Sequence, residues 1–140
     1  MVEAVALTFA DLTEGVRVVA PLCIDAGQMQ RFAELSGDFN PLHTDDAFAR
    51  QKGFDGKVVY GALLLAKVSE LIGMRLPGKN SVWASLSVDF LKPLYVDQPA
   101  ELEAVVARTS TGTGLVELGL TLRRGDKRLL KGRAEVIVVE

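Results

Sequence analysis

The later half of the chain alternates regularly between apolar and polar side chains. Four stretches after Pro77-Gly78 show this pattern: residues 82–90, 101–106, 116–123 and 130–138. A period of two residues is typical of strands that bury one face. The links at Thr109–Gly114 and Gly125-Asp126 suit antiparallel hairpins. The pattern therefore predicts an antiparallel sheet with one apolar face.

The longest apolar helix is predicted just before these strands. Residues 58–73 are apolar almost all the way round a helix, so we expect this helix to be buried rather than to lie on the surface. Gly73 and Pro77-Gly78 end it. An apolar helix followed by an antiparallel sheet with one apolar face is an α+β arrangement. Both apolar surfaces are covered if the sheet curls around the helix.

Shorter elements are predicted before this helix. Residues 16–24 predict a strand, which Pro21 places near an edge or a bulge, and we interpret Cys23 as a buried residue of that strand. Asp25 is a suitable N-cap for a helix that ends at Ser36-Gly37. The residues expected to form the buried stripe of this helix are Met29, Phe32 and Leu35.

The segment from residue 36 to residue 45 carries the candidate chemistry. Its sequence is Ser-Gly-Asp-Phe-Asn-Pro-Leu-His-Thr-Asp, in which Gly, Asn and Pro predict a loop, and a short helix is predicted over residues 45–50. His43 is the only histidine, a residue type that commonly serves as a general acid or base. Asp38 can act as a base or orient a water molecule. Asp and Asn before Pro are also common turn residues, so the same segment could simply form a turn.

Length and composition exclude several classes of function. The 140 residues predict a single domain, 1–140, with a real core. The net charge of −2 and the lack of a Lys/Arg run give nucleic-acid binding little support. One cysteine and one histidine exclude an intramolecular disulfide and make a zinc site unexpected. Without a basic N-terminal start or an apolar run of roughly 18–20 residues, we expect a cytoplasmic protein that does not span a membrane.

Two stretches of the chain resemble the MaoC-like dehydratases, a family that includes the (R)-specific enoyl-CoA hydratases. Residues 32–45, followed by Phe48-Ala49 and by Gly61 at the start of the apolar helix, resemble the hydratase motif. Residues 88–94, followed by Asp97, resemble the family's strand after the central helix. The resemblance covers nearly the whole chain. It implies a hot-dog fold, in which an antiparallel β-sheet wraps around a long central α-helix.

The resemblance also implies a reaction: reversible addition of water to a trans-2-enoyl thioester to give an (R)-3-hydroxyacyl thioester. It assigns Asp38 and His43 as the catalytic pair, with acid and base left open between them, and the Gly61 amide as the donor to the thioester oxygen. An amide at a helix start is suited to the negative charge that develops there. The expected substrate-binding positions are Asn40, Tyr60, Ala62 and Ser69.

The partners implied are an acyl-CoA or acyl-carrier-protein thioester and a second copy of the chain in a homodimer. CoA or phosphopantetheine belongs to the substrate, and no metal or other cofactor is expected. The family usually has His and Met where this chain has Tyr60 and Ala62, which leaves the substrate open. Ser69 could instead bond its own helix carbonyl four residues back.

Two other functions fit the same resemblance. One is a hot-dog acyl thioesterase, and the other is a non-catalytic acyl-thioester-binding subunit of a hydratase heterodimer. The intact Asp38 and His43 favour hydration. Three lysines could meet a substrate phosphate, although solvated surface charge is the favoured interpretation of each: Lys57, Lys67 and Lys92.

Overall fold

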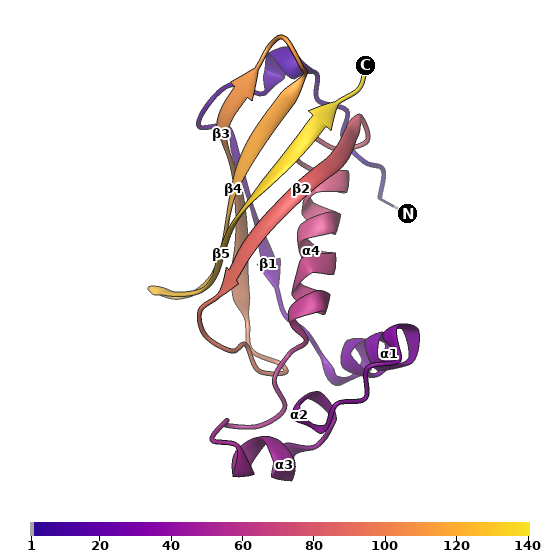
Figure 1. Cartoon of the computed structure of the whole chain (residues 1–140), viewed down its shortest axis with the longest axis vertical. Helices are drawn as coiled ribbons and strands as arrows, with labels where there is room; N and C mark the ends of the chain where they lie inside the picture. Colours follow the sequence, from indigo (N-terminus) through magenta and orange to yellow (C-terminus); the bar gives the residue numbers. More distant parts are fainter. Residues whose placement is uncertain (1) are drawn as a thin grey trace.

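The computed structural model describes residues 2–140, which form one antiparallel sheet packed against a long helix (Figure 1). In chain order the elements are η1 (Phe9–Asp11), β1 (Arg17–Leu22), α1 (Ala26–Ser36), α2 (Pro41–Thr44), α3 (Asp46–Gln51), α4 (Gly61–Met74), β2 (Ser81–Phe90), β3 (Ala100–Ser110), β4 (Leu115–Arg124) and β5 (Lys127–Val138). The sheet order is β1-β3-β4-β5-β2, and every pair is antiparallel. The predicted strands, their hairpins and the edge position of β1 are confirmed.

The inner face of the sheet and the helix α4 form the core. Four alternate residues of β4 are almost completely buried: Val116, Leu118, Leu120 and Leu122. On the helix, Val68 and Leu71 are 0% and 3% exposed. Each such side chain contributes about 1.5–3 kcal/mol through removal of apolar surface from water. The prediction of a sheet curled around a central helix is confirmed.

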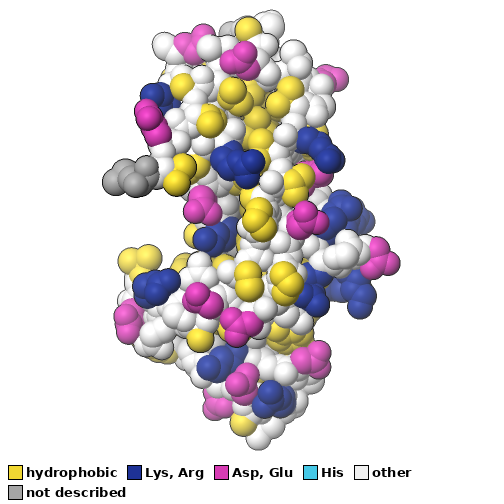
Figure 2. Space-filling model, turned by 180° about the vertical axis from the view of Figure 1, so that it is seen from behind, with side chains coloured by type: hydrophobic (Ala, Val, Ile, Leu, Met, Phe, Trp, Pro, Cys, Tyr) yellow, Lys and Arg dark blue, Asp and Glu magenta, His cyan; other side chains and the backbone are white. Residues whose placement is uncertain are grey.

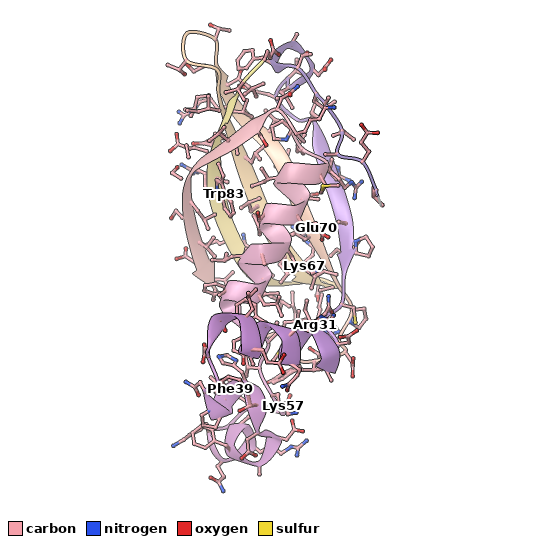
Figure 3. All side chains as sticks on the ribbon, turned by 90° about the vertical axis from the view of Figure 1, so that its right-hand side faces the viewer. Arg31, Phe39, Lys57, Lys67, Glu70 and Trp83 are labelled. Carbon is pink, nitrogen blue, oxygen red and sulfur yellow. The ribbon has the colours of Figure 1, made fainter. Side chains whose placement is uncertain are left out.

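One side of α4 is open, which contradicts the expectation that the helix is buried all round. Ala62, Ala66, Ser69 and Glu70 are exposed, and Figure 3 looks onto this side of the helix. The helix begins at Gly61 rather than at residue 58. No helix within residues 2–140 is long and apolar enough to cross a membrane.

A β-bulge changes which side chains β2 turns toward the helix. The register of the β2–β5 pair shifts just after Trp83, which lies opposite the fully buried Val136. Figure 3 shows Trp83 between β2 and α4. The alternation of the sequence assigns Val82 and Ala84 to the buried face, and this is wrong because both are exposed. One inserted residue reverses the facing of the side chains that precede it.

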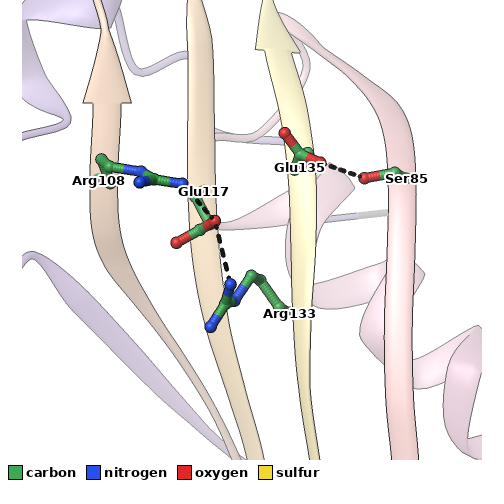
Figure 4. A network of polar contacts seen from close by, with 5 residues as sticks. All are labelled: Ser85, Arg108, Glu117, Arg133 and Glu135. Carbon is green, nitrogen blue, oxygen red and sulfur yellow. Dashed lines mark hydrogen bonds and ion pairs between the residues drawn. The ribbon is translucent and has the colours of Figure 1, made fainter.

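The outer face of the sheet is polar. Glu117 on β4 lies 3.2 Å from Arg108 on β3 and 3.7 Å from Arg133 on β5 (Figure 4). The Ser85 hydroxyl donates to Glu135 over 2.8 Å and links β2 to β5. Exposed ion pairs of this kind are worth ~0–1 kcal/mol each. The polar face therefore defines which side of the sheet faces water rather than holding the strands together.

Two residues of the first half are exposed where the sequence predicts burial. Leu35 is 85% exposed, because α1 turns Met29 and Ala33 inward instead. Cys23 follows the end of β1 and is exposed. It lines a groove of about 530 Å³ between β1 and α4 that contains none of the predicted site residues. Seen from behind, hydrophobic side chains gather along the middle of the molecule, flanked by charged ones (Figure 2).

Candidate active site

The segment from residue 36 to residue 45 is fixed by a chain of short hydrogen bonds between side chains and backbone. Helix α1 is capped by Asp25 as predicted and ends at Gly37, whose φ is +77°. The Asp38 amide donates to the Ser36 hydroxyl over 3.1 Å, and the Asn40 amide donates to the Asp38 carboxylate over 3.0 Å. Asn40 in turn accepts from the Leu42 amide over 2.9 Å. Asp38 and Asn40 therefore shape the loop, whatever else they do.

Part of this predicted loop is helical. Asn40 caps the single-turn helix α2, and Asp45 caps α3, which confirms the predicted short helix. Pro41 stands at the first position of α2, where its missing N–H costs no hydrogen bond. The sequence predicted a loop for this segment. The structure instead holds His43 on a helical turn.

His43 is partly buried and makes one defined hydrogen bond. Its Nδ1 lies 2.7 Å from the carbonyl oxygen of Val58, in the segment just before α4. A carbonyl oxygen can only accept, so the neutral ring carries its proton on Nδ1. This leaves Nε2 with a free lone pair. The Nε2 atom can therefore act as a base and accept a proton from a group that lies beside it.

Tyr60 lies against both members of the predicted catalytic pair. Its ring stacks on the His43 ring, with centroids 4.1 Å apart and planes at 29°. Its hydroxyl donates to the backbone oxygen of Asp38 over 2.6 Å. Burial, and to a lesser extent the negative charge of Asp38, raise the pKa of the Tyr60 hydroxyl. The hydroxyl therefore stays protonated and remains a donor around neutral pH.

The start of α4 offers free backbone donors. The amides of Leu63 and Leu64 donate to the carbonyl of Tyr60. Within residues 2–140, the Gly61 amide has no acceptor of its own, as is usual for the first position of a helix. A helix N-terminus attracts negative charge, so this amide is suited to an oxyanion.

A cleft of about 340 Å³ brings His43 and Gly61 together. Phe90 of β2 and Lys92 also line it, together with apolar residues from both loops. A Cβ atom on Gly61 would lie 3.0 Å from the tip of the Phe90 ring, so glycine allows this ring to approach the start of α4 closely. His43 and Gly61 thus line one cleft, and an imidazole near a free helix-start amide can move a proton beside a developing oxyanion.

Other predicted site residues lie outside the cleft. Tyr60 is only 2% exposed and contacts the loop, and it is not among the residues that line the cleft. Ala62 and Ser69 are exposed on the open side of α4. Asp38 and Asn40 stand on the exposed side of the loop. The substrate-binding roles of these residues stay predictions.

Two contributors to the site could not be singled out from the sequence. The Val58 carbonyl that orients His43 is a backbone group, and no sequence pattern marks it. Phe90 forms the wall opposite Gly61. Its alternation with polar neighbours in the sequence indicated only that it faces the helix.

A curled antiparallel sheet on a central helix, with an imidazole beside the first turn of that helix, is the arrangement of a hot-dog-fold enzyme. The chain belongs to the MaoC-like domain family, whose sequence model matches residues 9–122. The resemblance inferred from the sequence is therefore confirmed, as is the fold class.

Several similar proteins are named as hydratases or dehydratases. The chain is 30% identical to the 3-hydroxybutyryl-CoA dehydratase of Methylorubrum extorquens over 94% of its length and 84% of the relative. It is 42% identical to the (R)-specific enoyl-CoA hydratase of Aeromonas caviae over 59% of its length and 63% of the relative. A solved structure of the Aeromonas caviae (R)-hydratase matches with a TM-score of 0.86 and 32% identity, covering 91% of this chain and 97% of that one.

Proposed function

We propose that this chain catalyses the (R)-specific hydration of trans-2-enoyl thioesters, or the reverse dehydration of (R)-3-hydroxyacyl thioesters. The observation that carries the proposal is the cleft that His43 and the free Gly61 amide share. The hydratases and dehydratases among its relatives support the same reaction.

In the proposed reaction the thioester oxygen accepts a hydrogen bond from the Gly61 amide. Water adds to the β-carbon while the pair of Asp38 and His43 takes one of its protons, and the pair then returns a proton to the α-carbon. Product formation leaves the enzyme in its starting protonation state. The bond from His43 Nδ1 to Val58 leaves Nε2 to face the water. Proton transfer and charge stabilisation come from these groups, so the reaction needs no metal or redox cofactor.

A second copy of this chain is the proposed partner. The β2 edge runs for ten residues without proline, and Val82 and Phe90 on it are 53% and 54% exposed. The other edge, β1, contains Pro21, which lacks a donor for strand pairing. A long free edge is a template for another strand. Pairing of two β2 edges would cover the open side of α4 and the exposed side of the Asp38 loop, and would complete the binding site for a CoA or carrier-protein thioester.

The deciding experiment follows the loss of the conjugated enoyl-thioester absorbance with short and medium trans-2-enoyl-CoAs. Asp38→Asn keeps the oxygen that accepts from Asn40, so the loop is retained while the carboxylate is lost. We expect hydration to fall by at least about a hundredfold in Asp38→Asn and His43→Ala, since acid–base groups contribute ~10²–10⁴-fold.

The matched control is Asp45→Asn, the same substitution in the same segment. Asp45 caps α3, and asparagine caps helices equally well, so activity should persist. A thiol reagent run in parallel reports hydrolysis. Release of free thiol without hydration would replace the proposal with a thioesterase, and binding of enoyl-CoA without either reaction would indicate a non-catalytic subunit.

A further inference from the structure

The Tyr60 side chain contacts both Asp38 and His43. It is 2% exposed, lies between Phe32 of α1 and His43 of α2, and precedes Gly61 directly in the chain. Asp38, His43 and Gly61, the three residues of the proposed reaction, are thus all in contact with or bonded to one buried residue. A buried tyrosine with two separate contacts can fix two groups at once.

We propose that Tyr60 is a positioning residue of the site, and this role rests on the proposed function. Its ring fixes the orientation of the His43 imidazole by stacking on it, and its hydroxyl fixes the position of the Asp38 backbone by donating to the Asp38 carbonyl oxygen. Because Tyr60 is the N-cap residue of α4, the same residue also ties the acid–base pair to the Gly61 amide. The acid–base pair and the Gly61 amide are thereby fixed in position relative to one another.

The two contacts of Tyr60 have different chemical requirements. Stacking on His43 needs an aromatic face, which phenylalanine also supplies. The 2.6 Å bond to the Asp38 carbonyl needs a donor, which phenylalanine lacks. Burial raises the pKa of the Tyr60 hydroxyl and so keeps this donor protonated. Leucine would remove both contacts while keeping the position apolar. The variants Tyr60→Phe and Tyr60→Leu therefore separate the two effects.

Small displacements of reacting groups are costly for an enzyme. A shift of about 1 Å at the site can reduce the rate by roughly a hundredfold. Loss of one hydrogen bond that only positions a loop should cost less. For Tyr60→Phe we expect kcat on a trans-2-enoyl-CoA to fall roughly three- to tenfold, equivalent to about 0.7–1.4 kcal/mol, with KM nearly unchanged.

Tyr95→Phe is the matched control. Tyr95 is the only other tyrosine, and its hydroxyl also holds one loop, by accepting from the Asp55 amide over 3.0 Å. It is not part of the proposed acid–base pair or of the oxyanion donor. We expect wild-type kcat and KM for this variant. Equal losses in Tyr60→Phe and Tyr95→Phe, or a wild-type kcat in Tyr60→Phe, would overturn the proposal.

The single histidine permits a second readout that needs no substrate. In ¹⁵N- and ¹³C-labelled protein, all imidazole signals belong to His43. The stacked Tyr60 ring should shift these signals by its ring current; Tyr60→Phe should retain the shift and Tyr60→Leu should abolish it. Unchanged His43 signals in a folded Tyr60→Leu protein would overturn the role of the ring. If wild type hydrates no enoyl thioester, the proposed function fails while this test of positioning still stands.

Discussion

Gly61 combines the proposed oxyanion donor with close packing against the Phe90 ring. A methyl group added there would meet the tip of the Phe90 ring at 3.0 Å. That ring is 54% exposed, so it can move aside without strain in the core. Crowding at Gly61 should therefore affect the cleft much more than the fold.

For Gly61→Ala we expect a large loss of activity and little change in stability. Activity should fall roughly ten- to hundredfold, because the thioester oxygen is displaced from the amide. The free energy of unfolding should stay within about 1 kcal/mol, since alanine suits a helix better than glycine does. Enoyl-CoA kinetics and urea denaturation measure the two quantities.

The double variant Gly61→Ala/Phe90→Ala tests the cause of that loss. If the methyl group acts by crowding the ring, removal of the ring should restore part of the activity. No recovery in the double variant would mean that the loss does not arise from the contact with Phe90.

At the residue scale, the sequence predicted the chemistry but not the contacts that orient it. Asp38 and Asn40 could be recognised because their bonds reach only two residues along the chain. The bonds from His43 to Val58 and from Tyr60 to Asp38 span 15 and 22 residues and end on backbone oxygens. A backbone acceptor exists at every residue, so its use leaves no trace in the sequence.

At the scale of elements, the strand β4 shows how strongly burial governs stability. Leu118 points to α4 and is fully buried, whereas Leu35 on α1 is 85% exposed. Both positions hold the same side chain. The difference in their surroundings alone should decide the effect of the same substitution.

We expect Leu118→Ala to lower the free energy of unfolding by about 2–5 kcal/mol, because it loses buried apolar surface and leaves a cavity. Leu35→Ala, the matched control, should change it by no more than about 0.5 kcal/mol. Urea denaturation of both variants gives the comparison. Similar losses in the two variants would contradict the orientation of α1 or β4.

Periodicity predicted most elements correctly because strands and helices repeat over many residues. The exceptions are local. The bulge after Trp83 adds one residue to β2 without changing the composition of the strand, so the alternation assigned Val82 and Ala84 to the wrong face. Apolar residues occur almost all the way round α4 and predict a buried helix, yet the sheet covers only one side of it. An apolar surface indicates that something covers it, but not which chain does so.

At the scale of the whole molecule, the free β2 edge and the open side of α4 predict a homodimer. Val82→Lys places a charge on the β2 edge, and two such charges would lie close together in the paired sheets. We expect this variant to be monomeric at concentrations where wild type is dimeric, as measured by sedimentation.

Val2→Lys serves as the control for the dimer test. Val2 is 81% exposed and lines the groove beside β1, at the opposite edge of the sheet from β2. This variant should sediment like wild type. A monomeric wild type, or a Val82→Lys protein that still dimerises, would contradict the proposed interface.

The strand order also bears on when the site forms as the chain folds. Strands β3, β4 and β5 close through short hairpins, whereas β1 must find β3 and β2 must find β5 across 88 and about 50 residues, as the pairs Arg17–Val105 and Leu86–Ala134 show. Distant pairings form late because loop closure precedes their contacts. Residues 38–61 leave the ribosome before β2, β3, β4 and β5, yet the cleft that they share with Phe90 and Lys92 is complete only when β2 has paired with β5. The chain should therefore be inert until nearly all of its sheet has been synthesised.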